Sequence, residues 1–359
     1  MSETILQPGE KIKPEITKEE VISIIERNYE VSIFEISELV SYDDRNFLIT
    51  DRSGSKFVFK MLNKLDSKFP SHIDAQNQMM LYLQSKAINC PSPLYNKGGE
   101  LVTKVILTTA DGQEIVSLAR LLTYIPGVTL NKVQYTTKVF IQVGELIATL
   151  TNALENFHHD GIMKYDKIWR LDSSIKALDF AYAVKDDHRR NLSVMALEKF
   201  QEVVIPQIDH LAKSPIHGDL NELNIIVQET KNADMGFGII DFGDAHFSCT
   251  VFDLAVAMCY MIMECEITTP LDAGGYVLAG FLKHRSLTTL EYSLLKICIC
   301  ARLSQSLILG NFAYVYDGNE YALTTSKKGW PLLEVIWNTP DSEIYSKWQE
   351  ITNSISRGR

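Results

Sequence analysis

The chain has 359 residues, a length that exceeds one comfortable core and predicts two lobes or domains. Hydrophobic residues make up 46% of it and charged residues 22%, as in ordinary globular enzymes. The formal net charge of −10 argues against a nucleic-acid partner, because phosphate binding needs a basic surface, and it is compatible with a small cationic substrate.

The N-terminal residues 1–13 are polar and carry no apolar segment, so no signal peptide is predicted. The longest apolar runs are interrupted by charge, at Asp253, Lys296 and Arg302, which argues against a membrane span. The six cysteines form no C-x-x-C pair and are predicted to be buried free thiols of a reducing compartment. We therefore expect a cytoplasmic protein without a membrane or an obligate protein partner.

Residues 1–16 are expected to form a flexible leader, and residues 17–122 a small N-terminal lobe that binds the nucleotide. The first helix of this lobe begins at the capping-box pattern Thr17-Lys-Glu-Glu20 and runs to about residue 28. The turn residues Asp51-Arg-Ser-Gly54 predict a hairpin. The lobe is predicted to be mostly antiparallel sheet, with strands at 33–40, 46–50, 56–61, 101–108 and 114–122, and one helix at 72–86.

After Pro126-Gly127 the pattern changes, and residues 123–359 are predicted to form a larger, mostly helical lobe for catalysis and substrate binding. One helical stripe of apolar residues recurs at spacings of three and four between Phe140 and Phe157. Further helices are predicted at 174–185, 190–211, 250–265, 273–283 and 289–307, with only short strands near 225–228 and 237–240. The fold class is therefore α+β, with a small antiparallel β lobe before a helical lobe.

The most informative segment is His217-Gly-Asp219-Leu-Asn-Glu-Leu-Asn224, which runs into a β-branched strand. A second carboxylate, Asp241, follows another apolar strand and begins Asp241-Phe-Gly-Asp244. Phosphoryl transfer needs a carboxylate that takes the proton of the acceptor hydroxyl, and hard oxygen ligands for Mg²⁺. Kinases supply these groups as a catalytic-loop Asp, an Asn five residues later and a DFG Asp. The spacing therefore predicts Asp219 as the catalytic base, and Asn224 and Asp241 as metal ligands.

Each of these motifs by itself is typical of an ordinary turn, and only their order and their place after two apolar strands favour a catalytic site. His217 is predicted to bond to backbone and fix the loop rather than to carry a proton. The motifs alone do not name the acceptor.

The strand Lys56-Phe-Val-Phe-Lys60 alternates, so Val58 and Lys60 share one face. An exposed lysine at a strand end is the ordinary interpretation, but beside the downstream motifs Lys60 matches the kinase lysine that contacts the α- and β-phosphates. In kinases this lysine usually pairs with a glutamate of the following helix, but the helix predicted here has no glutamate at that position. Gln76 or Asp74 is therefore predicted to be the partner of Lys60.

The segment Ser41-Tyr-Asp-Asp-Arg45-Asn-Phe47 takes the place of a phosphate loop, although it contains no glycine. Its backbone amides, helped by Ser41 and Arg45, are predicted to cover the phosphates, with a plain surface role for Arg45 as the alternative. The hinge is predicted at Arg120-Leu-Leu-Thr-Tyr-Ile-Pro-Gly127, where the purine would pair with backbone around Leu122 and Tyr124.

With these motifs the chain resembles the superfamily of aminoglycoside phosphotransferases and choline kinases, and within it the hydroxylysine kinases. The His-Gly-Asp-x-x-x-x-Asn and Asp-Phe-Gly-Asp segments are signatures of the superfamily. The narrower likeness is carried by residues 41–47, by residues 120–127 and by Gly274-Gly-Tyr-Val-Leu-Ala-Gly-Phe281, and it extends from about residue 18 to residue 335.

The resemblance implies a bilobal protein-kinase-like fold and transfer of the γ-phosphate of GTP, rather than ATP, to the hydroxyl of 5-hydroxy-L-lysine with Mg²⁺. Asp241-Phe-Gly-Asp244 runs directly into the helix around Val251, without a long activation segment, which favours a small-molecule acceptor over a protein. Choline, ethanolamine, homoserine or an aminoglycoside remain alternative acceptors. A catalytically inactive nucleotide-binding scaffold is the alternative from another class.

The acceptor expected from the resemblance carries two ammonium groups and one carboxylate. Asp253 is expected to cap the catalytic loop rather than to bind substrate. Arg302 is a candidate for the substrate carboxylate, with a buried structural ion pair as its alternative. The acidic candidates for the ammonium groups are Glu222, Asp244, Asp253, Glu264 and Asp272.

Overall fold

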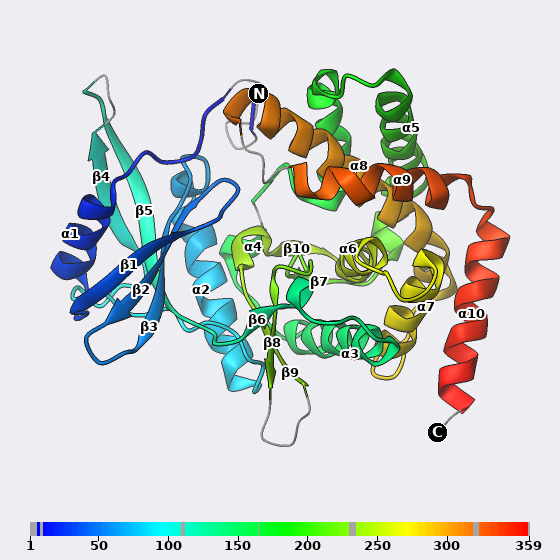
Figure 1. Ribbon diagram of the computed structural model, residues 1–359, viewed down its shortest axis with the longest axis horizontal. Helices are drawn as coiled ribbons and strands as arrows, with labels where there is room; N and C mark the ends of the chain where they lie inside the picture. Colours follow the sequence, from blue (N-terminus) through cyan, green and yellow to red (C-terminus); the bar gives the residue numbers. More distant parts are fainter. Residues whose placement is uncertain are drawn as a thin grey trace. The chain divides into compact units, whose positions relative to one another are not determined.

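The computed structural model describes residues 6–7, 10–108, 112–163, 165–229, 235–318 and 323–357. The chain forms two compact units, Met1–Pro126 with His159–Asp166, and Gly127–His158 with Lys167–Arg359 (Figure 1). Residues 1–5, 8 and 9 of the predicted leader lie outside the described residues. At its C-terminal end, Ile12 and Ile16 are buried in the first unit, and the Ile12 carbonyl accepts a hydrogen bond from the Lys64 amide.

The first unit is built on an antiparallel sheet of five strands. The hairpin predicted at Asp51 is confirmed, because the Asp51 carboxylate accepts hydrogen bonds from the Ser53 and Ser55 amides at 2.8 Å. Gly54 has φ +85° there, a backbone conformation that favours glycine. The strands in spatial order are β1 (Ile33–Leu39), β2 (Arg45–Asp51), β3 (Lys56–Met61), β5 (Glu114–Thr123) and β4 (Thr103–Thr108).

Helix α1 (Lys18–Asn28) and helix α2 (Pro70–Ser85) pack on the sheet through different sets of side chains. The capping box of Thr17 and Glu20 starts α1, whose Val21 and Ile25 join a core with Phe47 and Phe59. Residue 60 lies on the opposite face of β3 from Phe59, because side chains alternate along a strand.

The face of the sheet that carries Lys60 is the face that α2 covers. Arg120 pairs with Lys60 across the β3–β5 ladder, and it donates a hydrogen bond to Asn77 of α2 at 2.9 Å. Arg120 is buried, so this bond anchors the helix beneath the lysine. The short helix α4 (Asp160–Met163) belongs to the same unit, and a Cβ at Gly161 would lie 2.0 Å from the Ser71 carbonyl of α2.

The second unit is mostly helical, as predicted, and two of its helices touch through glycines. A Cβ at Gly144 would lie 1.9 Å from the Val277 carbonyl, and one at Gly280 would lie 1.9 Å from the Ile141 carbonyl. Only glycine therefore permits this backbone approach between α3 (Thr137–Leu154) and α7 (Pro270–Phe281). The helices are α3 (Thr137–Leu154), α5 (Asp187–Val203), α6 (Thr250–Met263), α7 (Pro270–Phe281), α8 (Thr289–Asp317), α9 (Thr324–Asn338) and α10 (Asp341–Arg357).

The α-helix predicted at 174–185 is wrong, because the structure has a 3₁₀ helix, η3 (Leu171–Ala183). Apart from Ala181, its buried side chains recur at every third residue, the period of a 3₁₀ helix, rather than at the 3.6 of an α-helix. These side chains are Leu171, Ser174, Ala177, Phe180 and Ala183.

The helix predicted at 190–211 was too long, because Pro206 interrupts it. The α-helix α5 ends at Val203 and a 3₁₀ helix, η4 (Ile205–His210), follows. Helices α9 and α10 were not predicted. The short strands β6 (Val128–Thr129), β7 (Lys213–Ile216) and β10 (His246–Cys249) were also missed, while β8 (Ile225–Glu229) and β9 (Met235–Ile239) lie where two strands were expected.

Within α8, the span Thr289–Tyr316 is long and apolar enough to cross a membrane, but 83% of its most apolar window is buried within the protein. Such burial is typical of a core helix, and in Figure 1 α8 runs among α5, α6 and α9. The six cysteines are free thiols, as predicted, and all except Cys265 are buried.

Candidate active site

The predicted base, Asp219, lies on a loop after β7 that is held by its own asparagines. The Asn221 side-chain oxygen accepts hydrogen bonds from the Leu223 and Asn224 amides at 2.9 and 3.0 Å, which closes a tight turn. The Asn221 side-chain amide donates to the Asp219 carboxylate at 2.9 Å. Asn224 donates to the carboxylate and to the carbonyl of Asp219, each at 2.9 Å. The sequence spacing of five therefore brings Asp219 and Asn224 into direct contact.

His217 and Asp253 fix the start of this loop, as the sequence predicted. The His217 ring donates to the Ile240 carbonyl at 3.0 Å and accepts from the Asp219 amide at 3.3 Å, an arrangement that a neutral imidazole satisfies. Burial lowers the pKa of His217, against the pull of Asp253. The Asp253 carboxylate accepts from the His217 and Gly218 amides at 2.8 and 2.7 Å. Both side chains therefore serve the shape of the loop.

Arg302 of α8 forms an ion pair with the base, with its Nη2 atom 2.6 Å from the Asp219 Oδ1 atom. The same guanidinium donates to the Trp169 carbonyl at 3.0 Å and stands over the Trp169 and Tyr260 rings. Arg302 is only 2% exposed. Of the two roles that the sequence left open for it, the structure displays the buried ion pair, and the partner is the catalytic base itself.

Burial raises the pKa of Asp219 to about 6, partly opposed by Arg302 and increased by the charges of Asp244 and Asp241. A carboxylate with this pKa is ionised at neutral pH, yet it is basic enough to hold a proton during a reaction. The environment of Asp219 is therefore suited to a general base.

Asn224 and Asp241, the predicted metal ligands, lie at the same end of the β8–β9 hairpin. Ile225 pairs with Ile239, and the Ile240 amide donates to the Asn224 carbonyl at 2.9 Å, so both ligands directly adjoin the paired strands. Asp241 has φ +61°, a strained value for a residue other than glycine, and such strain concentrates at functional sites.

These two side chains fit a hard divalent cation. The Asn224 side-chain nitrogen is directed at Asp219, which leaves the amide oxygen as a ligand, and Asp241 supplies a carboxylate. Clusters of three or more His, Cys, Asp and Glu residues that could hold a metal by themselves are absent from the described ranges. A cation bound here would therefore share its coordination with phosphate oxygens and water, as Mg²⁺ commonly does.

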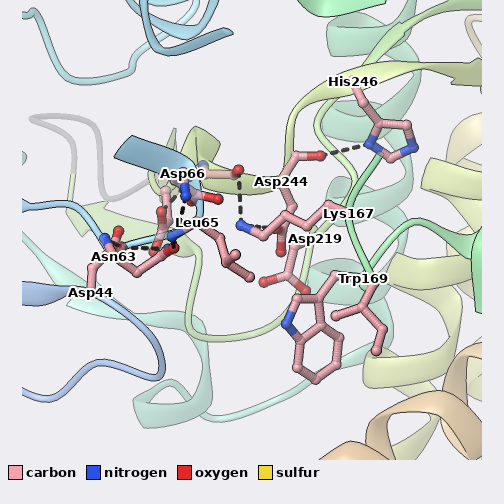
Figure 2. Close-up of polar contacts among 12 residues, drawn as sticks. Asp44, Asn63, Leu65, Asp66, Lys167, Trp169, Asp219, Asp244 and His246 are labelled. Atoms are coloured by element: carbon pink, nitrogen blue, oxygen red, sulfur yellow. Dashed lines mark hydrogen bonds and ion pairs between the residues drawn. The ribbon is translucent and has the colours of Figure 1, made fainter. Parts of the chain in front are cut away.

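Asp244, the last residue of the Asp-Phe-Gly-Asp segment, is held from two sides (Figure 2). Its carboxylate lies 2.7 Å from the Lys167 ammonium, and its carbonyl accepts a hydrogen bond from the His246 ring at 2.7 Å. A Cβ on Gly218, where φ is +82°, would lie 2.5 Å from the same carbonyl. The glycine of the His-Gly-Asp segment thus lets the two catalytic segments pack together.

In the first unit, the predicted phosphate lysine Lys60 lies 3.7 Å from the Asp44 carboxylate. Asp44 also accepts hydrogen bonds from the backbone and the side chain of Asn63, at 2.8 and 3.0 Å (Figure 2). Asn63 in turn accepts from the Leu65 and Asp66 amides. Asp44 was not singled out in the sequence, because a loop carboxylate carries no spacing signal that would pair it with a strand lysine.

The two helix residues considered as partners of Lys60 lie differently. The Asp74 carboxylate is 3.2 Å from the His159 ring, so Asp74 contacts a histidine. Gln76 is fully buried in α2. Asp44, whose carboxylate lies beside Lys60, comes instead from the loop between β1 and β2.

Ser41 and Arg45, predicted to cover the phosphates, flank the loop that contains Asp44. The Ser41 hydroxyl donates to the Asp44 carbonyl at 2.5 Å and stiffens the turn. The Arg45 guanidinium forms a forked pair with Glu38, at 2.5 and 2.9 Å, and stands over the Phe47 ring. Arg45 is thus held along the edge of the sheet, and its role toward a nucleotide stays a prediction.

The predicted hinge residues are Leu122, near the end of β5, and Tyr124, the first residue after this strand. Leu122 is buried and bridges to Pro93. The Tyr124 amide donates to the Lys56 carbonyl at 3.1 Å, and the Tyr124 ring lies beneath the Lys56 ammonium. Because this amide is already bonded, a purine held by the segment would use the other backbone groups there.

The sequence profile of the phosphotransferase enzyme family matches residues 35–286 of the chain. The protein belongs to this family. The matched range includes Lys60, Asp219, Asn224 and Asp241, so the predicted site lies inside the part that defines the phosphotransferases.

Over 361 residues this phosphotransferase is 32% identical to a hydroxylysine kinase of Xenopus laevis, with 95% of each chain covered. Its fold is similar to an amicoumacin kinase solved in complex with AMP-PNP, Ca²⁺ and Ami, at a TM-score of 0.65 and 14% identity, covering 92% of this chain and 94% of the other. It is also similar to the GDP complex of aminoglycoside 2′-phosphotransferase-IIIa, at a TM-score of 0.57 and 17% identity, covering 90% and 98%.

These findings confirm the predicted α+β kinase-like fold and the predicted enzyme class, a small-molecule phosphotransferase with an alcohol acceptor. The pair of Asp219 with Arg302 was missed as a pair, because the two residues are 83 positions apart. Lys167 was not identified at all, because a lysine after an irregular segment has no motif of its own.

Proposed function

We propose that this phosphotransferase transfers the γ-phosphate of a nucleoside triphosphate, GTP in preference to ATP, to the 5-hydroxyl of 5-hydroxy-L-lysine. The observation that carries the proposal is the built catalytic loop, in which Asp219 contacts Asn224 and Arg302, in a chain that matches a hydroxylysine kinase over 95% of its length. Solved proteins of similar fold have been crystallised with AMP-PNP or GDP, which supports a nucleotide donor.

In the proposed reaction, the acceptor hydroxyl oxygen forms a bond to the γ-phosphorus while the bond from that phosphorus to the β,γ-bridging oxygen breaks. The nucleoside diphosphate leaves with the bridging oxygen, and the hydroxyl proton passes to Asp219. Lys60 would hold the α- and β-phosphates. Asn224 and Asp241 would hold Mg²⁺, which neutralises phosphate charge when it is bound.

The pKa of Asp219, about 6, matches this role because the residue is ionised at neutral pH and accepts a proton during transfer. Arg302 keeps the carboxylate in place between turnovers. The cytoplasm, where nucleoside triphosphates are abundant, is the proposed location.

The test is to incubate the purified protein with Mg²⁺, GTP or ATP, and a panel of hydroxylated amines, and to detect phosphorylated products by mass spectrometry. The panel holds 5-hydroxy-L-lysine, choline, ethanolamine, homoserine and an aminoglycoside. We expect turnover of hydroxylysine, faster with GTP. Turnover of another member alone would replace the acceptor, and nucleotide binding without any turnover would favour the inactive scaffold.

A further inference from the structure

The acidic side chains near the catalytic loop of the second unit differ in whether the protein already satisfies them. Asp253 accepts two backbone amides of the loop, at 2.8 and 2.7 Å. Asp244 pairs with Lys167 at 2.7 Å. Asp272 accepts a hydrogen bond from Thr268 at 2.7 Å and lies 3.3 Å from Lys347. These three carboxylates therefore have structural partners.

Glu264 is also engaged, because its carboxylate lies 2.9 Å from the Lys328 ammonium. Lys328 lies 3.3 Å from Glu266 as well, so this lysine is shared by two surface-side carboxylates.

Glu222 is the exception among the five candidates. It lies on the catalytic loop between Asp219 and Asn224 and is only 7% exposed. Its Oε2 atom is buried and has no hydrogen-bond partner within the described part of the chain. The surrounding backbone is fixed, because the Asn131 amide bonds to the Glu222 carbonyl at 3.4 Å and Asn221 closes the turn beside it.

The Tyr135 hydroxyl is a second buried polar group without a hydrogen-bond partner among the described residues. Burial raises the pKa of Tyr135, and the nearby charges of Glu222 and Glu264 raise it further, so the Tyr135 hydroxyl stays neutral. An acidic group and a hydroxyl thus share one region of the second unit, and each has a buried oxygen without a hydrogen-bond partner among the described residues.

Burial raises the pKa of Glu222 to about 8, so the ionised form of this acid is costly without a bound cation, and a protein that keeps such an acid at a functional loop gains something other than stability. An ammonium group would satisfy it, since it presents three donors and a positive charge. A metal ion would need more ligands than one carboxylate and one hydroxyl supply.

We propose that Glu222 binds an ammonium group of the phosphate acceptor, with the Tyr135 hydroxyl as a second acceptor for the same group. This inference rests on the proposed function, since it requires an acceptor that carries an amine. It makes Glu222 the residue that selects amino alcohols, three positions after the base that activates the hydroxyl.

The test compares Glu222→Gln with wild type and with a matched control, Glu266→Gln, in full-length protein with Mg²⁺ and GTP. For hydroxylysine we expect the KM of Glu222→Gln to rise about 10- to 100-fold, the loss that follows removal of a charged hydrogen-bond partner. Its kcat should stay within about threefold of wild type, because the base and metal ligands remain. Glu266→Gln, whose side chain is 78% exposed, should match wild type.

Two acceptor analogues separate recognition of the amine from damage to the loop. One is 6-amino-5-hydroxyhexanoic acid, which lacks the α-amine, and the other is 2-amino-5-hydroxyhexanoic acid, which lacks the ε-amine. On the analogue without the ammonium group that Glu222 binds, wild type and Glu222→Gln should have the same KM. An equal loss on all three acceptors, or no loss on hydroxylysine, would overturn the proposal.

Thermal unfolding without acceptor gives an independent readout. Glu222→Gln should unfold at the wild-type temperature or higher, because an amide that cannot ionise replaces a buried acid whose Oε2 atom has no hydrogen-bond partner among the described residues. A marked drop would show a structural role and contradict the inference. If wild type does not phosphorylate hydroxylysine, the proposed function fails by itself, and the same comparison is made with the amino alcohol that the panel identifies and with its amine-free analogue.

Discussion

The catalytic loop of the second unit and the phosphate-binding segments of the first unit are held in opposite ways. Around Asp219, loop asparagines and a buried arginine hold the carboxylate, and a buried aspartate holds the backbone of the loop. Around Lys60, the partner found is a loop carboxylate, Asp44, at 3.7 Å. The first region is preorganised for proton transfer. In the second region, an anionic ligand such as a phosphate would have to compete with the Asp44 carboxylate for Lys60.

The largest expected effect comes from Asp219→Asn, which removes the base from the preorganised region. We expect kcat to fall by about 10²- to 10⁴-fold, the usual contribution of a general base. Binding of the nucleotide should persist, because the variant leaves Lys60 and the metal ligands in place. Steady-state kinetics and a nucleotide titration measure the two effects. A rate near that of wild type would remove Asp219 from the base role.

Asp241→Ala tests the metal side of the same region. Loss of a direct ligand should weaken binding of Mg-nucleotide by at least about 10- to 100-fold, the range seen when only a supporting group of a metal site is removed. Calorimetric titration with Mg²⁺ and without it checks this expectation. An unchanged affinity would refute the assignment of Asp241 as a ligand.

The pH dependence of kcat/KM sharpens the comparison through Arg302. Asp219 must be ionised to act as a base, and burial raises its pKa to about 6. We therefore expect kcat/KM to reach its plateau above about pH 6 and to fall about tenfold per pH unit below it. Arg302 lowers the pKa of Asp219, so Arg302→Met should move the acidic limb to higher pH. A limb that stays in place in Arg302→Met would show that another group titrates.

The smallest effect is expected in the first unit. Asp44→Asn frees Lys60 from a carboxylate, so nucleotide affinity should rise, by about two- to fivefold given the modest strength of such pairs. A nucleotide titration with Ser53→Ala as a surface control measures it. A clear loss of affinity would instead assign Asp44 to the support of the nucleotide.

Much of the fold could be predicted, because periodic burial and turn residues are local signals. The Thr17–Glu20 capping box, the Asp51 hairpin and the strands β8 and β9 appear where the sequence indicated. The errors arise where the local signal is ambiguous or too short. The spacing of apolar residues in the 3₁₀ helix η3 is similar to that of an α-helix, and strands β7 and β10, which pair with each other, are too short to show a clear alternation.

The sequence was enough to predict Asp219, Asn224 and Asp241 as a catalytic group, since they lie in short motifs whose spacing depends only on the local chain. It also predicted that His217 and Asp253 shape the loop. Tertiary structure alone decided how the charges pair. Arg302 reaches Asp219, Asp44 reaches Lys60, and the Oε2 atom of Glu222 is buried without a hydrogen-bond partner among the described residues. Pairing and burial depend on distant segments that meet only in the folded chain, so no local pattern encodes them.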